Sequence, residues 1–101
     1  MSLEKKFLKT KPVCKVKFTL TDDAAALAST VALVGDFNDW SPMTTPLKKS
    51  RTGAWSISLD FETGRSYQFR YLVNGENSLN ESQADSYVAN GFGTDNAVLA
   101  L

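Results

Sequence analysis

The sequence contains no histidine. Its absence removes the commonest general base, the Ser-His and Cys-His nucleophile pairs, and every histidine-based zinc site. The six glycines are spread over several turns, and no glycine-rich loop precedes a helix to cradle phosphates. Asp36 and Asp39 share one loop, but so small a domain offers little cleft for two catalytic carboxylates to flank. We therefore predict a domain without enzymatic activity, metal ion or cofactor.

Cysteine and long apolar runs are also scarce. Cys14 is the only cysteine, which excludes an internal disulfide and agrees with a reducing compartment. No apolar run approaches the ~18 residues that cross a bilayer, and the N-terminal residues lead into no signal-peptide hydrophobic region. These features predict a cytoplasmic protein.

Net charge is absent as well, because eleven basic residues balance eleven acidic ones. No global field draws the chain to nucleic acid or to an anionic membrane, and neither is an expected partner. Only the N-terminus is biased, and residues 1–11 are interpreted as a basic, solvated tail and edge strand, with a weak docking arm as the alternative. Residues 12–101 are long enough for one compact domain.

What the chain does contain is a series of short alternating segments. Apolar residues recur at every second position in residues 14–20, 55–61 and 67–73, a pattern typical of strands with one buried face. This alternation directs Cys14 and Trp55 into the core and Arg70 away from it. Asn74-Gly75 predicts a type I′ hairpin turn. Turn signals at 8–12-residue spacing and almost no helix predict an all-β antiparallel sandwich of about seven strands, immunoglobulin-like in architecture.

A tryptophan in a polar loop is the most informative single residue. Trp40 follows Val34-Gly35-Asp36-Phe37-Asn38-Asp39 and precedes Ser41-Pro42, where the chain turns and water reaches it. A large rigid apolar plate at such a place serves a partner, or else it caps the hydrophobic core. The sequence leaves both interpretations open.

These segments resemble the family 48 carbohydrate-binding modules. Residues 34–40 are similar to the family's G-x-F-N-x-W loop, Gly53-Ala54-Trp55 to its next strand, and residues 67–75 to its Y-x-F-x-V-D-G hairpin. Asp85-Ser86-Tyr87 and Gly93-Thr94-Asp95-Asn96 resemble the closing segments. Such modules precede the catalytic barrel of glycogen-branching and debranching enzymes, including isoamylase, and form the glycogen-binding domain of the AMP-activated kinase β subunit. The resemblance covers about residues 12–101 and implies an immunoglobulin-like sandwich of the early-set type.

The resemblance also implies a set of ligand-binding residues. Trp40 matches the tryptophan on which the sugar stacks, Arg70 replaces a lysine that donates to sugar hydroxyls, and Asn96 matches an asparagine that hydrogen-bonds the glucan. Phe92 and Thr94 fall at further loop contacts. Asn77 stands where kinase-type members carry a second tryptophan, so half of the aromatic clamp is missing.

Two functions follow from this resemblance. The first is a non-catalytic module that binds an α-1,4-glucan such as glycogen, starch or a maltooligosaccharide. The second is a structural or protein-interaction domain that has lost sugar binding and packs against a catalytic or kinase partner, in association with a branching or debranching enzyme.

Overall fold

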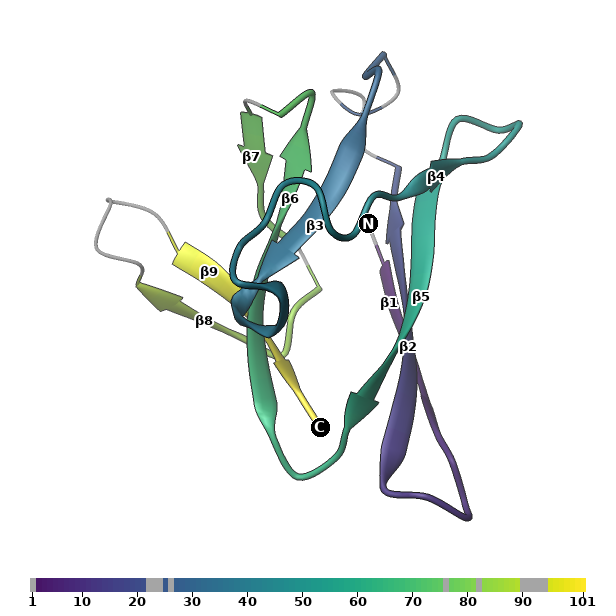
Figure 1. The fold of residues 1–101 in the computed structure, drawn as a ribbon, viewed down its shortest axis with the longest axis vertical. Helices are drawn as coiled ribbons and strands as arrows, with labels where there is room; N and C mark the ends of the chain where they lie inside the picture. The colour runs from purple at the N-terminus through teal and green to yellow at the C-terminus, as the bar shows by residue number, and fades with distance from the viewer. Residues whose placement is uncertain (1, 22–24, 26, 76, 82, 90–94) are drawn as a thin grey trace.

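Two antiparallel sheets build the molecule in the computed structural model, which describes residues 2–21, 25, 27–75, 77–81, 83–89 and 95–101. The four-stranded sheet, on the right of Figure 1, has the order β1-β2-β5-β4. Its strands are β1 (Ser2–Phe7), β2 (Val13–Leu20), β5 (Trp55–Glu62) and β4 (Lys48–Lys49).

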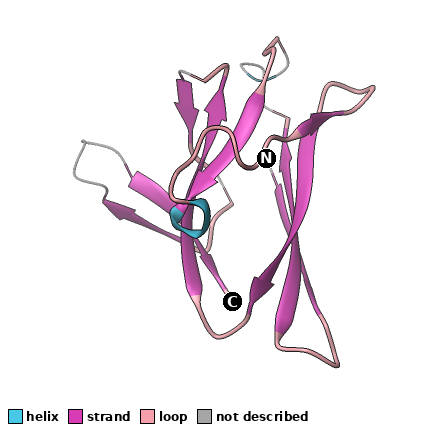
Figure 2. Ribbon diagram, viewed as in Figure 1, coloured by secondary structure: helices cyan, strands magenta, loops and turns pink. Residues whose placement is uncertain are grey.

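The second sheet, on the left of Figure 1, has five strands in the order β3-β6-β9-β8, with β7 also paired to β6. They are β3 (Val31–Gly35), β6 (Ser66–Val73), β9 (Asp95–Ala100), β8 (Ser86–Ala89) and β7 (Asn77–Leu79). Strands dominate the described residues in Figure 2. The predicted all-β sandwich is confirmed, with nine strands in the described part of the chain rather than about seven.

The strands that alternation did not reveal are short or lie at an edge. Strand β1 pairs with β2 from Ser2↔Thr19 to Phe7↔Cys14, and therefore forms one edge of the four-stranded sheet. Strands β4 and β7 have two and three residues. Segments this short cannot carry a period-two signal, so only pairing in the folded sheet defines them.

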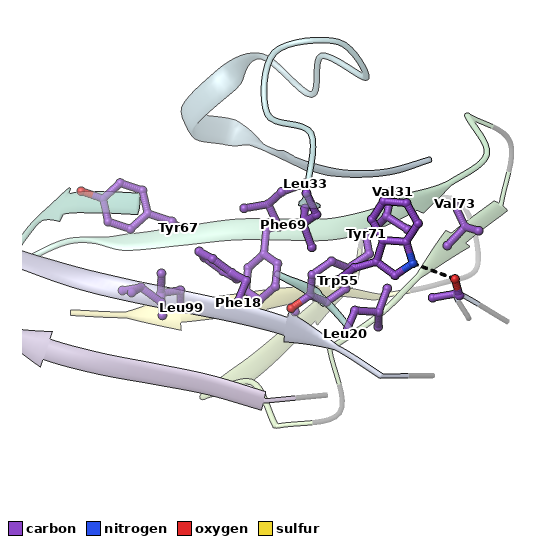
Figure 3. Close-up of a cluster of buried hydrophobic side chains, with 14 of the residues drawn as sticks. Phe18, Leu20, Val31, Leu33, Trp55, Tyr67, Phe69, Tyr71, Val73 and Leu99 are labelled. Atoms are coloured by element: carbon purple, nitrogen blue, oxygen red, sulfur yellow. Dashed lines mark hydrogen bonds between the residues drawn. The ribbon is translucent and has the colours of Figure 1, made fainter. Parts of the chain in front are cut away.

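The hydrophobic core fills the space between the sheets. Figure 3 shows side chains from β2, β3, β5, β6 and β9 meeting there, with Phe18 edge-on to Phe69 at a centroid distance of 5.2 Å. Cys14 has no exposed surface, and Trp55 is only 6% exposed. The Trp55 Nε1–H donates to the Ala25 carbonyl at 2.8 Å, drawn dashed in Figure 3. Cys14 and Trp55 therefore both lie in the core, as predicted.

Strand β6 separates the core from the outer face of the five-stranded sheet. Its buried residues Tyr67, Phe69, Tyr71 and Val73 alternate with half-buried Gln68, Arg70 and Leu72, which confirms the predicted alternation. The turn after β6 differs from the prediction. Asn74 and Gly75 have the expected positive φ angles of 55° and 70°, but Val73 pairs with Asn77, so three residues separate the paired positions. A type I′ hairpin would leave only two.

Candidate functional site

The loop after β3 begins at a glycine that has no room for a side chain. A Cβ atom on Gly35 would lie 2.5 Å from the backbone oxygen of Gln68 and closer still to the ring of Phe37. The φ of Gly35 is −167°, which any residue adopts, so its requirement is steric rather than conformational. Gly35 therefore allows the short 3₁₀ helix η1 (Asp36–Asn38) to start directly against β6.

Two side chains of η1 fix the loop. Phe37 packs against the core with its ring 5.2 Å from that of Phe61. Asn38 accepts the Gly35 N–H through Oδ1 at 3.0 Å, and its Nδ2 donates to the Leu33 carbonyl and to Thr45 Oγ1, both at 3.0 Å. The Asn38 side chain thus joins both ends of the loop, because Thr45 lies where the chain returns to β3.

Trp40 follows this anchored turn in an unusual backbone conformation. Asp39 and Trp40 both have φ of 56°, and the Trp40 N–H donates to the Gly35 carbonyl at 2.8 Å. Positive φ is rare for a bulky residue and costs about 1–3 kcal/mol when the surroundings enforce it. The Trp40 side chain is 39% exposed, in contrast to the buried Trp55.

Arg70 lies near this loop on the outer face of β6. Arg70 pairs with Val34 of β3. The next pair along these strands is Gly35↔Phe69, and the Gly35 carbonyl accepts the Trp40 N–H. Arg70 Nε donates to Ser78 Oγ, and Nη1 donates to the Asp95 carbonyl, which also accepts Asn80 Nδ2 at 3.0 Å. These bonds hold the guanidinium against the sheet and use two of its five N–H donors.

Asn96 extends the same face toward β9. Its Nδ2 donates to Gln68 Oε1 at 3.1 Å, and the residue is only 8% exposed. Amide, hydroxyl and guanidinium groups from β6, β7, β9 and the segment after β7 therefore form two neighbouring hydrogen-bonded groups, one around Arg70 and one between Gln68 and Asn96. Together we call these residues the polar strip: Gln68, Arg70, Ser78, Asn80 and Asn96.

Of the three remaining residues predicted for the site, Asn77 lies in the described part of the chain and does not join this strip. Asn77 is exposed on β7, but it pairs with Val73, whose side chain faces the core. Because successive strand residues point to opposite faces, Asn77 faces away from its neighbour Ser78 and from Arg70. Phe92 and Thr94 lie outside the described residues.

Sequence reasoning named Trp40, Arg70 and Asn96 but missed the residues that hold them. Gln68 was recognisable, because the alternation of β6 places it two positions before Arg70 on one face. Ser78 and Asn80 carry no such signal, since they belong to a polar segment whose pairing with β6 only the fold defines. Asn38 appears in the loop motif, but its three hydrogen bonds depend on the return of Thr45 to β3.

The loop after β3 offers a partly exposed indole plate, and the polar strip offers a guanidinium and amide groups. An indole stacks on apolar faces, and guanidinium and amide N–H groups donate to hydroxyls. No group of three potential metal ligands occurs among the described residues. In the same part of the chain, no helix is long and apolar enough to span a membrane.

Comparison with known proteins identifies relatives of this chain. The profile of carbohydrate-binding module 48 (isoamylase N-terminal domain) matches residues 25–88, which include Trp40 and Arg70. The chain is also similar to 1,4-alpha-glucan branching enzyme GlgB 2 from two strains of Xanthomonas campestris pv. campestris, 8004 and ATCC 33913. Each match is 42% identical over 47 residues, which cover 46% of this chain and 6% of the enzyme. The chain therefore spans a small fraction of the length of these relatives.

Proposed function

The chain belongs to the carbohydrate-binding module 48 family, whose members are non-catalytic binding modules, and we propose that it binds α-1,4-glucan on the outer face of the five-stranded sheet. In this proposal a pyranose ring stacks on Trp40, while Arg70 and Asn96 hydrogen-bond its hydroxyls. The isolated domain holds the glucan and breaks no bond. Glycogen, starch and maltooligosaccharides share the required chemistry, and binding takes place in the cytoplasm.

The observation that carries this proposal is the presentation of Trp40. The loop around it is anchored by Phe37 and Asn38, yet the indole is 39% exposed on a residue with φ of 56°. Backbone strain of this kind persists where the surrounding structure enforces it, and it concentrates at binding sites. A core cap would gain nothing from such strain, so the exposed plate favours a ligand contact.

The polar strip supplies the hydrogen-bonding half of the site. Arg70 is already positioned by Ser78 and the Asp95 carbonyl, so a sugar hydroxyl meets a preorganised donor. Gln68 joins Asn96 in our proposal, because their side chains share a hydrogen bond on the same face. We assign Phe92 and Thr94 to further contacts by their place in the family motif, whereas Asn77 supplies no second aromatic plate.

The proposed site has a low affinity, because Asn77 supplies no second aromatic ring to stack on the sugar. Stacking that removes ~100 Å² of apolar area from water contributes about 2.5 kcal/mol at ~25 cal/mol per Å². Hydrogen bonds from Arg70 and Asn96 contribute about 1–1.5 kcal/mol each, and association entropy offsets part of the sum. The expected Kd for a short oligosaccharide is therefore about millimolar, near −4 kcal/mol.

A protein-interaction role is the second candidate. It is favoured by Asn77, which faces away from Arg70 and leaves Trp40 without an opposing ring. The branching enzymes that the chain resembles are also much longer than the match. In this alternative the same face packs against a catalytic or kinase partner.

Native electrophoresis in gels that contain glycogen separates the two candidates. We expect glycogen to retard the protein and Trp40→Ala to abolish the retardation while the domain stays folded. Phe7→Ala is the matched control, because Phe7 is an aromatic residue 55% exposed on the other sheet. Unchanged mobility of the intact protein in glycogen would remove the glucan-binding proposal.

A further inference from the structure

Strand β8 ends the five-stranded sheet at an edge that the described part of the chain leaves open. It pairs with β9 from Ser86↔Val98 to Ala89↔Asp95, and no described residue pairs with its other side. In Figure 1 it lies at the left-hand margin of the sheet. Every second residue of such a strand directs its backbone N–H and C=O groups outward, where another strand can pair with them.

The other edge strands that the structure describes are protected against such pairing. Strand β1 carries three charged residues in succession, Glu4, Lys5 and Lys6, and β4 consists of two lysines. Charged side chains, lysine above all, discourage pairing at an edge. Strand β3 is covered by the loop that returns from η1, because the Thr45 carbonyl accepts the Leu33 N–H at 2.9 Å. Strand β7 has only three residues.

Strand β8 has none of these protections except modest length. Its four residues, Ser86-Tyr87-Val88-Ala89, include no charge and no proline, and all of them are exposed. Tyr87 is 44% exposed and Val88 38%, and they lie on opposite faces because successive strand residues alternate. The Tyr87 hydroxyl donates to the Glu81 carbonyl, which holds the ring in place. The edge thus combines unpaired backbone groups with exposed apolar side chains on both faces.

A second copy of β8 is the partner that this edge fits. In an antiparallel pair with two-fold symmetry, Tyr87 meets Tyr87 of the second copy, and Ser86 meets Val88, so aromatic rings pair directly. No like charges face each other within the strands, and the flanking Asp85 carboxylate is bound to Lys5 at 2.7 Å. A charged peptide would find no complementary group on β8. Pairing of two identical edges also leaves neither of them open.

We propose that two copies of this chain associate through β8, so that their five-stranded sheets form one continuous sheet. The two-fold axis of such a pair is perpendicular to the sheet, and the outer faces of both copies therefore lie on the same side. Val88 pairs with Asn96, so the polar strips face the same direction, with their β9 strands about 14 Å apart, or three strand spacings. The dimer presents two proposed glucan sites on one side. That consequence rests on the proposed function, whereas the pairing of the strands does not.

Sedimentation velocity without sugar tests the pairing. Four residues from each copy form a contact well below the ~1,200 Å² at the lower end of stable interfaces, so we expect a weak dimer with a Kd of about 100 µM. The sedimenting mass should rise from one chain to two as the protein concentration passes from about tenfold below to about tenfold above this Kd.

Val88→Lys should weaken the association about tenfold or more, because a lysine at a sheet edge opposes pairing. Met43→Lys is the matched control. It adds the same charge at a residue that is 84% exposed in the loop after η1, and it should leave the Kd within about twofold. Circular dichroism checks that both variants are folded.

Amide hydrogen exchange of the unsubstituted protein locates the interface without any substitution. At high protein concentration, the outward-facing amides of Ser86–Ala89 should exchange more slowly than at low concentration, because they become hydrogen-bonded. The amides of β1 and β4 should exchange at the same rate at both concentrations.

The outcomes separate this inference from the glucan-binding function. A protein that stays monomeric to about 1 mM, or a dimer that Val88→Lys leaves unchanged, would overturn the pairing. Species larger than a dimer would also contradict it, because the two-fold pair uses both open edges. A monomer that binds glycogen overturns this inference alone, and a dimer that fails to bind glycogen overturns the proposed function alone.

Discussion

At the scale of single residues, Trp40 combines exposure with backbone strain. Its φ of 56° is a conformation that glycine adopts freely and that a bulky residue adopts at a cost. Asn38 and the bond from the Trp40 N–H to the Gly35 carbonyl hold the turn in place. The ring at position 40 is thus maintained against a local conformational preference, which is the pattern expected of a binding residue.

Trp40→Gly separates binding from stability. Glycine relieves the strain at positive φ, so we expect the free energy of unfolding to stay within about 1 kcal/mol of the unsubstituted protein. Retardation in glycogen gels should be lost, because the stacking plate is gone. Urea unfolding monitored by circular dichroism measures the free energy of unfolding. A loss of stability well beyond that range would show that the ring caps the core.

The loop motif also shows what sequence reasoning can and cannot provide at this scale. Local polarity makes an exposed Trp40 one of two open interpretations, and alternation predicts the outward direction of Arg70. The steric need for Gly35 has no such local signal, because its constraint comes from Gln68 on another strand. Likewise, the low exposure of Asn96 results from packing beside Gln68 across two strands.

At the scale of elements, the long strands could be predicted from the sequence, whereas the short and edge strands could not. Strands β2, β5 and β6 have eight residues each and show apolar alternation, so their existence was predictable. Strand β1 carries Glu4, Lys5 and Lys6 and lacks that signal; its position is defined by pairing with β2. Lysines are common on edge strands because they discourage pairing with a further strand. The composition of this segment therefore indicated an edge strand but not the strand with which it pairs.

A salt bridge ties β1 to the opposite sheet. Lys5 Nζ lies 2.7 Å from Asp85 Oδ2 and also donates to the Ala100 carbonyl at 3.2 Å, while the Ala100 N–H donates to Asp85 Oδ2 at 2.7 Å. Partial burial raises the pKa of Asp85, but the hydrogen bonds from Lys5 and Ala100, together with the charge of Lys5, outweigh it. The pKa of Asp85 is therefore held below its usual range.

This arrangement predicts a pH-dependent contribution to stability. A carboxyl whose pKa is lowered by folding stabilises the folded state above its unfolded pKa, about 3.9, and this contribution is lost as pH falls through the folded pKa. Lys5→Met should therefore lower the urea midpoint at pH 7 and change it less at pH 2. Lys6→Met is the control, because Lys6 is an exposed neighbour that pairs with Lys15 on β2. A decrease in the urea midpoint that is equal at pH 7 and pH 2 for Lys5→Met would contradict the account.

At the scale of the whole molecule, our proposal is one weak binding face on a small domain. Glycogen and starch present many equivalent chains, so a millimolar site gains retention when several copies act together. Affinity for a polysaccharide should therefore depend on how many modules are joined.

Two copies joined by a flexible Gly/Ser linker test this dependence. We expect the tandem protein to bind glycogen about a hundredfold more tightly than one copy, because the second contact becomes intramolecular. A tandem protein with Trp40→Ala in one copy should return to the affinity of a single module. Sedimentation with glycogen measures both, and equal affinities for the tandem and the single module would exclude a multivalent role.

The two tryptophan indoles provide the most direct test of the glucan-binding proposal. Trp40 is 39% exposed, whereas Trp55 is 6% exposed and bonded to Ala25, so their N–H resonances report separately on the proposed site and on the core. Trp40→Phe assigns the two peaks in a ¹H–¹⁵N NMR spectrum. During titration with maltoheptaose, the Trp40 resonance should shift to saturation while that of Trp55 stays in place. A stationary Trp40 resonance at sugar concentrations of about ten millimolar or more, well above the expected Kd, would contradict the account.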